Sequence, residues 1–259
     1  MIDSHCHLDF KDFNKNRDEV IQNARAASVF TMINIGADLT TSINSVKLAD
    51  QYDFIYAAVG VHPHDATTYD ENVEQELLRL AENKKVKAIG EIGLDFYRDL
   101  SPRNIQKGVF RRQLELAISL KLPVVIHARD AYKETVQIVR EYSQNLAGGV
   151  FHCFQGDAQK AQKVIDLGFS VSVGGKITYK NDEMAAMAAG IPLEYILLET
   201  DSPYLTPIPL RGKSSNQPAY VRYVRDKLAD LKNVSVEEVE KITDRNSQKL
   251  FRLVDMFEG

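Results

Sequence analysis

The sequence is poor in cysteine, has no long apolar run and lacks an excess of positive charge, and each absence excludes a class of protein. The two cysteines, Cys6 and Cys153, lie far apart, so we expect no disulfide framework, a reducing compartment and two small buried side chains. No apolar run is long enough to cross a bilayer. The first residues lack the basic and apolar segments of a signal peptide. We therefore expect a cytoplasmic protein with no membrane partner.

The charge balance of the chain limits how it can meet nucleic acid. Lysine and arginine number 32 against 36 aspartates and glutamates, which gives a net charge of −4. This excludes a protein that coats nucleic acid through bulk positive charge, but not an enzyme that acts on it locally, because bound metal ions supply their own positive charge. With 259 residues and 44% hydrophobic side chains, the chain can bury a large core. We expect one domain over residues 1–259, as a monomer.

Short β-branched runs alternate with longer amphipathic stretches along the chain. After a first strand at the amino terminus, strands are expected at Phe30–Gly36, Phe54–Val61, Val86–Ile92, Pro123–His127, Gly149–His152, Phe169–Val173 and Tyr195–Leu198. The expected helices are Lys15–Ser28, Leu39–Gln51, Asn72–Asn83, Ile105–Leu120, Ala131–Ser143, Ala158–Leu167, Asp182–Ala189, Tyr220–Leu231 and Ser235–Phe257. Thr40 or Thr41 is expected to cap the second helix, and Gly168 to end the sixth.

This alternation predicts an α/β fold, a single (β/α)8 TIM barrel. A doubly wound open sheet is the alternative. Against it, no Gly-x-Gly-x-x-Gly follows the first strand, and polar residues recur after strand upon strand around the whole chain.

All six histidines fall at or just after the carboxyl end of an expected strand: His5, His7, His62, His64, His127 and His152. In a barrel these ends gather at one rim, where the active sites of this fold lie. If the amino terminus is a strand, His5 and His7 share a face and Cys6 points away. Glu91 and Asp201 occupy equivalent positions after apolar residues, where a carboxylate needs a partner.

These positions predict a two-metal ligand set at the C-terminal rim of the strands: His5, His7, Glu91, His127, His152 and Asp201. Imidazole and carboxylate ligands suit Zn²⁺ and Mn²⁺, and carboxylates alone would favour Mg²⁺. Either Glu91 or Asp201 can bridge two ions. Singly, each residue has an ordinary structural explanation, such as a core histidine for His127 or a turn carboxylate for Asp201. Their joint occurrence at strand ends favours the metal site.

Other polar and aromatic residues near this rim bear on the substrate. Three basic residues can bind phosphate oxygens: Arg129, Lys176 and Arg211. Solvated loop charge is the alternative for them, and it is preferred for Lys213. His62 and His64 can serve as ligands or as donors that face the substrate. Three aromatic residues can stack on bases or pack a lid: Tyr97, Phe154 and Tyr204.

Six motifs, taken in order, resemble those of the TatD-type metal-dependent deoxyribonucleases. They are Ser-His-Cys-His at 4–7, Gly-Val-His-Pro-His at 60–64, Gly-Glu-Ile-Gly-Leu-Asp at 90–95, His-Ala-Arg-Asp-Ala at 127–131, His-Cys-Phe-Gln-Gly at 152–156 and Leu-Glu-Thr-Asp-Ser-Pro-Tyr-Leu-Thr-Pro at 198–207. The matches run from Asp3 to beyond Pro218, and as an ordered set they are highly specific. The resemblance implies a barrel of the amidohydrolase-like superfamily that hydrolyses DNA phosphodiesters by metal-activated water, often from the 3′ end of single strands.

The resemblance also implies roles for individual residues. Each of two divalent ions would be held by two histidines: His5 with His7, and His127 with His152. Glu91 would bridge the ions, and Asp201 would complete the first site and accept a proton from the attacking water. His62 and His64 would lie at the substrate phosphate, His62 with a part in catalysis. The chain departs from the family pattern at Gln217, which stands where Asn-Glu-Pro usually has its glutamate.

Two other functions remain open for a barrel of this kind. An amidase, deacylase or small-ester hydrolase would share the His-x-His start. Many such sites bridge their metals with a carboxylated lysine, whereas this strand end carries Glu91. A non-catalytic metal-binding module is the third alternative, and the full set of six ligands disfavours it.

Overall fold

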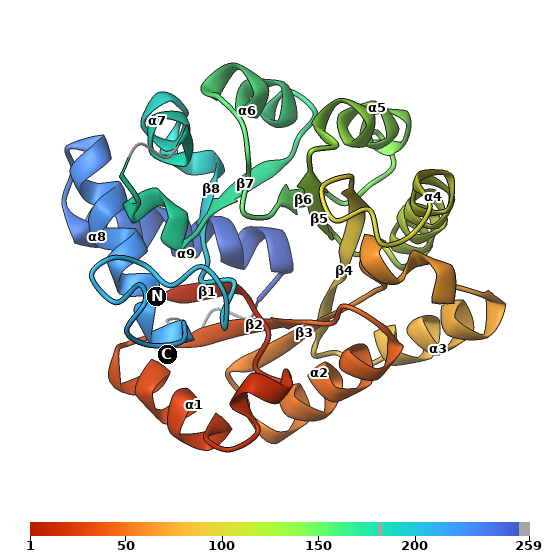
Figure 1. The fold of residues 1–259 in the computed structure, drawn as a ribbon, viewed down its shortest axis with the longest axis horizontal. Coiled ribbons are helices and arrows are strands. Elements are labelled where there is room, and N and C mark those ends of the chain that lie inside the picture. The colour runs from red at the N-terminus through yellow and green to blue at the C-terminus, as the bar shows by residue number, and fades with distance from the viewer. Residues whose placement is uncertain (181–182, 254–259) are drawn as a thin grey trace.

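The computed structural model describes residues 1–180 and 183–253. Within them, eight strands form one parallel sheet in the order β1 to β8, and the helices surround it (Figure 1). The strands are β1 (Ile2–Cys6), β2 (Thr31–Ile35), β3 (Ile55–Val59), β4 (Val86–Asp95), β5 (Val124–Arg129), β6 (Gly149–Phe151), β7 (Ser170–Val173) and β8 (Ile196–Leu198). The sheet closes where Cys6 pairs with Ser202, just after β8. The predicted (β/α)8 barrel is confirmed, and the open-sheet alternative is wrong.

The helices follow the strands as expected, with small differences at their ends. They are α1 (Arg17–Ala26), α2 (Leu39–Gln51), α3 (Glu71–Ala81), α4 (Arg103–Leu120), α5 (Tyr132–Tyr142), α6 (Ala158–Ile165), α7 (Glu183–Gly190), α8 (Val221–Lys232) and α9 (Val236–Phe251). Gly168 lies beyond α6 in the left-handed region, with φ +86°. Helix α9 ends at Phe251 because Arg252 also has a positive φ. Asp182 and residues 254–257, which were expected to be helical, lie outside the described residues.

The expected cap of α2 was wrong. Asp38 caps this helix, because its carboxylate accepts the N–H of Thr41 at 2.7 Å. The Thr41 hydroxyl in turn accepts the N–H of Asp38 at 2.8 Å, so the two residues form a reciprocal capping box. Asp38 directly precedes the expected first residue of the helix and is of a type that favours the cap position, so the sequence did contain this signal.

Strand β4 is three residues longer than expected, and this positions the site. Glu91 lies inside β4 as expected, but the strand continues past Ile92 to Asp95. Gly93 pairs with His127 of β5, and a Cβ on Gly93 would lie only 2.0 Å from the His127 carbonyl oxygen. Glycine at this position therefore lets β4 approach β5 closely, which brings Glu91 near His127.

Two apolar layers follow from the alternation of side chains along the strands. One layer lies between the strands and the helices and includes Val124 and Phe110. The other fills the barrel interior, where strand residues such as Val125 and Leu197 pack with Phe251 of α9. His127 lies two residues after Val125 on the same face, so polar residues continue the interior stack above this apolar layer. No helix among the described residues is long and apolar enough to span a bilayer.

Candidate metal centre

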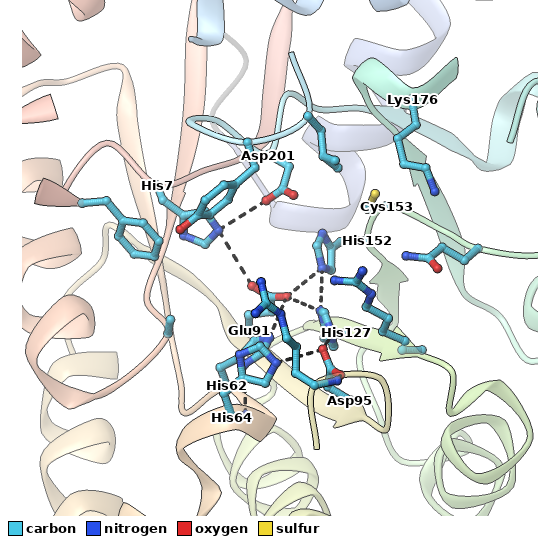
Figure 2. Close-up of a pocket in the computed structure, with 18 of the residues that line it drawn as sticks. His7, His62, His64, Glu91, Asp95, His127, His152, Cys153, Lys176 and Asp201 are labelled. Atoms are coloured by element: carbon cyan, nitrogen blue, oxygen red, sulfur yellow. Dashed lines mark hydrogen bonds and ion pairs between the residues drawn. The ribbon is translucent and has the colours of Figure 1, made fainter. Parts of the chain in front are cut away.

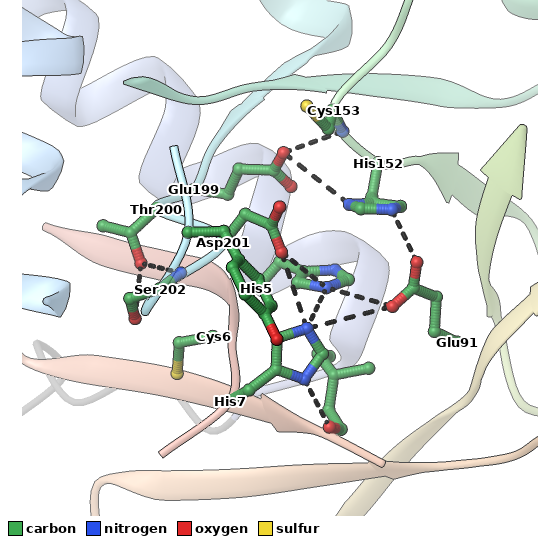
Figure 3. Close-up of polar contacts among 12 residues, drawn as sticks. His5, Cys6, His7, Glu91, His152, Cys153, Glu199, Thr200, Asp201 and Ser202 are labelled. Atoms are coloured by element: carbon green, nitrogen blue, oxygen red, sulfur yellow. Dashed lines mark hydrogen bonds and ion pairs between the residues drawn. The ribbon is translucent and has the colours of Figure 1, made fainter. Parts of the chain in front are cut away.

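A cavity of about 770 Å³ opens at the carboxyl ends of the strands (Figure 2). Its lining includes all the predicted site residues except one: His7, His62, His64, Glu91, His127, Arg129, His152, Lys176, Asp201 and Arg211. The exception, His5, is fully buried beneath it and directs a ring nitrogen into the same cluster. Cys6 points the other way, with Sγ 3.5 Å from the Ile33 carbonyl oxygen (Figure 3). Both cysteines are buried and free, as expected.

One end of the cluster is built by β1 and the segment after β8. The Nε2 atoms of His5 and His7 lie 3.2 Å apart. Asp201 Oδ1 lies 3.7 Å from His5 Nε2 and 3.5 Å from His7 Nε2 (Figure 3). The segment after β8 is fixed to β1, because Asp201 N–H donates to the His5 carbonyl oxygen at 2.9 Å.

Glu91 links this end of the cluster to the other. Its Oε2 lies 3.5 Å from His5 Nε2. Its Oε1 lies 2.7 Å from both His127 Nδ1 and His152 Nε2, and 3.6 Å from His62 Nε2. Each carboxylate oxygen therefore faces a different set of imidazoles, and the side chain is only 4% exposed.

The donor atoms fit a divalent cation. The Nδ1 of His7 lies 2.9 Å from the Ile35 carbonyl oxygen, which can only accept, so the proton of the neutral ring is on Nδ1 and Nε2 carries a lone pair. That lone pair faces another imidazole nitrogen and two carboxylates, which would repel it unless a cation or a proton lay between them. The Nδ1 of His5 is buried and has no hydrogen-bond partner among the described residues. Imidazole and carboxylate together are the ligands that bind zinc and similar metals in proteins.

Three sets of ligand atoms lie within 4.8 Å of one another: His5 with His7 and Glu91, His5 with His152 and Asp201, and His62 with Glu91 and His127. These sets contain all six residues predicted as ligands, and they add His62. His152 lies close to both ends, with Nε2 3.1 Å from His127 Nδ1 and its ring stacked on that of His5 at 4.1 Å.

The pKa values show how strongly these groups interact. Burial alone would lower the pKa of His152, but Glu91 beside it raises it to about 10. Burial and the neighbouring His152 lower the pKa of His5 to about 4. Burial would raise the pKa of Glu91, yet the surrounding imidazoles hold it well below its usual range. The carboxylates of the cluster are therefore ionised at neutral pH and attract cations.

Two carboxylates in this region were not predicted from the sequence. Asp95, at the end of β4, receives hydrogen bonds from both His64 and His127. Glu199 accepts the N–H of Cys153 at 2.7 Å and the hydroxyl of Ser172, and burial raises its pKa to about 7 (Figure 3). A signal was present in both cases. Asp95 follows Glu91 by four residues on one strand, and Glu199 precedes Asp201 by two, on the same face.

Cations and aromatic rings surround the mouth of the cavity. The Arg129 guanidinium lies 3.9 Å from the centre of the Tyr97 ring, and Arg211 lies 4.0 Å from that of Tyr179. The Tyr97 and Tyr204 side chains are 59% and 52% exposed, whereas Phe154 is buried at 3%. Phe154 therefore packs inside the protein, and the two tyrosines remain available to a ligand.

Two further predictions concern residues of the loop after β8. Lys213 is exposed, as expected for solvated loop charge. Gln217, the departure from the family pattern, accepts a hydrogen bond from Asn23 of α1 at 3.3 Å and does not line the cavity. The substitution thus affects the contact between this loop and α1, away from the ligand cluster.

A parallel barrel with a histidine–carboxylate cluster at its C-terminal rim is typical of the metal-dependent hydrolases. Residues 2–252 match the family model for TatD-related DNases. A metal-dependent hydrolase of Bacillus subtilis, YabD, is 41% identical, with 98% of this chain and 99% of that protein covered. The 3′-5′ ssDNA/RNA exonuclease TatD of Klebsiella pneumoniae is 34% identical, with 97% of each chain covered. The crystal structure of the TatD homologue YJJV from Escherichia coli superposes with a TM-score of 0.92 at 30% identity over 98% of each chain. The chain belongs to the TatD-related DNase family, which confirms the resemblance.

Proposed function

We propose that the protein is a divalent-metal-dependent nuclease that cleaves phosphodiester bonds of DNA, as a 3′–5′ exonuclease on single strands. The observation that carries this proposal is the position of Glu91, which directs one carboxylate oxygen to each of two imidazole sets beneath a cavity with arginines at its mouth. Relatives named as metal-dependent hydrolases and as a single-strand exonuclease support it.

In this proposal the cluster would hold two divalent ions. The residues of the first site would be His5, His7 and Asp201, those of the second would be His127 and His152, and Glu91 would contribute to both. His62 is a further candidate for the second site, because its Nε2 lies 3.6 Å from Glu91 Oε1. Bound divalent ions there would lower the pKa of a water molecule and neutralise charge on the phosphoryl oxygens. The ligand types tolerate Zn²⁺, Mn²⁺ and Mg²⁺, so the assay must identify the working metal.

The other residues act on the substrate. Asp201 lies at the cavity floor with its carboxylate ionised, so it can accept a proton from the attacking water. Three basic residues line the cavity that holds the acidic cluster: Arg129, Lys176 and Arg211. In this proposal their positive charges bind the phosphate oxygens of the substrate. His64 would lie beside the phosphate, because its side chain lines the cavity and is 27% exposed.

The aromatic residues favour an unpaired strand. Phe10, just after β1, stacks on His7 with the ring centres 4.4 Å apart. It also contacts the ring of Tyr204, which follows the adjoining strand β8. Tyr97 lies just after the end of β4 and Arg129 is the last residue of β5, and these strands lie opposite β8 and β1 in the barrel. Exposed rings on two facing walls can stack on unpaired bases, which a duplex keeps inside its helix.

The experiment uses metal-stripped protein and a 5′-labelled single-stranded oligonucleotide, with Mg²⁺, Mn²⁺ or Zn²⁺ restored in turn. We expect a ladder that shortens from the 3′ end, no cleavage without metal, and loss of cleavage in Glu91→Ala and Asp201→Ala. The Asp65→Asn variant removes a carboxylate from the same cavity wall and serves as the matched control. Intact DNA under every metal, together with hydrolysis of an amide or small ester, would replace the nuclease with the amidase class.

A further inference from the structure

Asp95 connects the metal cluster to the substrate side of the cavity. Its carboxylate Oδ2 lies 3.0 Å from His127 Nε2 and 2.9 Å from His64 Nε2. His127 faces Glu91 with its other nitrogen, whereas His64 lines the open part of the cavity (Figure 2). One oxygen atom therefore holds a candidate metal ligand and a substrate-facing histidine together.

The rest of the Asp95 residue is fixed by other bonds. Its Oδ1 accepts the N–H of Tyr97 at 3.0 Å and of Arg98 at 2.7 Å. Its backbone N–H donates to Gln106 Oε1 at 2.9 Å, and the Gln106 amide donates back to the Asp95 carbonyl oxygen at 3.1 Å. Asp95 and Gln106 are both fully buried. The carboxylate thus has a single orientation, set by α4 and by the turn after β4.

This arrangement decides which nitrogen of His127 can bind a metal. An ionised carboxylate only accepts hydrogen bonds, and His127 lies between two of them, with Nε2 3.0 Å from Asp95 Oδ2 and Nδ1 2.7 Å from Glu91 Oε1. A metal ion held by Glu91 and by His152, whose Nε2 lies 3.1 Å from Nδ1, would take the lone pair of Nδ1, and the proton of the neutral ring would then lie on Nε2, where Asp95 accepts it. A neutral His64 likewise carries its proton on Nε2 beside Asp95. By contrast, Glu199 Oε1 lies 3.8 Å from His152 Nδ1, too far for a hydrogen bond, so Glu199 does not fix His152 in this way.

We propose that Asp95 is a positioning residue that keeps the proton of His127 on Nε2, so that Nδ1 is presented to the metal, and that holds His64 at the substrate side through the same oxygen. This inference rests on the proposed metal-dependent function. A carboxylate that orients a metal-binding histidine typically changes metal affinity by 10- to 100-fold.

The Asp95→Asn variant tests this with little change of shape. The amide oxygen can keep the bonds from Tyr97 and Arg98, which places the NH₂ group opposite the two histidines. The NH₂ group donates, so each Nε2 must become an acceptor and each proton must move to Nδ1. For His127 this puts a hydrogen where the metal should bind. We therefore expect the variant to fold and to bind Zn²⁺ or Mn²⁺ roughly 10- to 100-fold more weakly.

Two measurements decide the matter without any DNA. Calorimetric titration with Zn²⁺ or Mn²⁺ compares wild type, Asp95→Asn and the control Asp65→Asn, which removes a cavity carboxylate and is expected to keep wild-type affinity. Nitrogen NMR of ¹⁵N-histidine protein loaded with Zn²⁺ reads which nitrogen of His127 carries the proton. We expect Nε2–H with a metal-bound Nδ1 in wild type, and loss of the metal-bound Nδ1 signal in Asp95→Asn at the same Zn²⁺ concentration.

Wild-type affinity in Asp95→Asn would overturn the proposal. So would a proton on Nδ1 of His127 in the Zn²⁺-loaded wild-type protein, and this second test holds even if the variant does not fold. If affinity and tautomer change as expected while DNA stays intact, Asp95 keeps its role and only the proposed nuclease function fails.

Discussion

Replacing Glu91 by glutamine should remove most of the stabilisation that metal binding gives to the fold. Glutamine has nearly the same shape, but it carries no charge and offers one acceptor oxygen in place of two. Both Glu91 oxygens face imidazoles, at 2.7 Å on one side and 3.5 Å on the other, so both proposed sites are weakened at once. We expect a loss of metal affinity at the upper end of the range for supporting carboxylates, about 100-fold or more.

The size of the effect follows from linkage. At a metal concentration of about 100 times the wild-type Kd, binding stabilises the folded state by about 2.7 kcal/mol. For a chain of this length that raises Tm by roughly 5–11 °C. With 100-fold weaker binding, the same concentration gives about 0.4 kcal/mol, or roughly 1–2 °C.

The assay is a thermal melt of each protein in chelator and again with Mn²⁺. Asp65→Asn removes the same charge from the cavity wall at a residue outside the proposed ligand set, and it should keep the full wild-type shift. A wild-type shift in Glu91→Gln would contradict the proposed role of Glu91, because it would mean that metal binds without the carboxylate at the centre of the cluster.

Three further predictions concern the fold and the cavity mouth. The side chain of Phe251 in α9 packs into the barrel interior and is only 1% exposed. Phe251→Ala should therefore lower the free energy of unfolding, measured in urea, by about 3–5 kcal/mol. A loss below about 1 kcal/mol would show that the interior is not packed there. Partial burial would raise the pKa of Glu240, but the ion pair with Arg225 lowers it. The ionised carboxylate therefore stabilises the fold above its unfolded pKa of about 4.3, and this stabilisation is lost as the pH falls through the lower pKa of the folded state. Glu240→Gln should therefore reduce stability at about pH 7 and have little effect at about pH 3; an equal effect at both would contradict the ion pair. Tyr204→Ala should raise KM for a single-stranded oligonucleotide by roughly 5- to 150-fold, the range for loss of one stacked base, with Tyr204→Phe close to wild type; an unchanged KM in the alanine variant would exclude stacking at this ring.

The barrel and the position of its polar rim could be predicted from the sequence because both depend on regular patterns. Alternating apolar runs fix the order of strands and helices, and parallel strands in a closed barrel must bring their carboxyl ends together. Residues as distant in the sequence as His5 and Asp201 therefore had to meet, and the structure places their ligand atoms 3.7 Å apart.

The details that failed depend on contacts that no local pattern records. The extension of β4 to Asp95 follows from pairing with β5 and from the absence of a side chain on Gly93. The role of Asp95 depends on two histidines that lie 31 and 32 residues away in the sequence, and so it becomes visible only in three dimensions.

The most direct test of the metal centre is a crystal of the protein soaked in Mn²⁺ or Zn²⁺ and measured for anomalous scattering. We expect two peaks on either side of the Glu91 carboxylate, one near His5, His7 and Asp201 and the other near His127 and His152. Peaks elsewhere on the surface, with none at Glu91, would contradict the proposed metal centre.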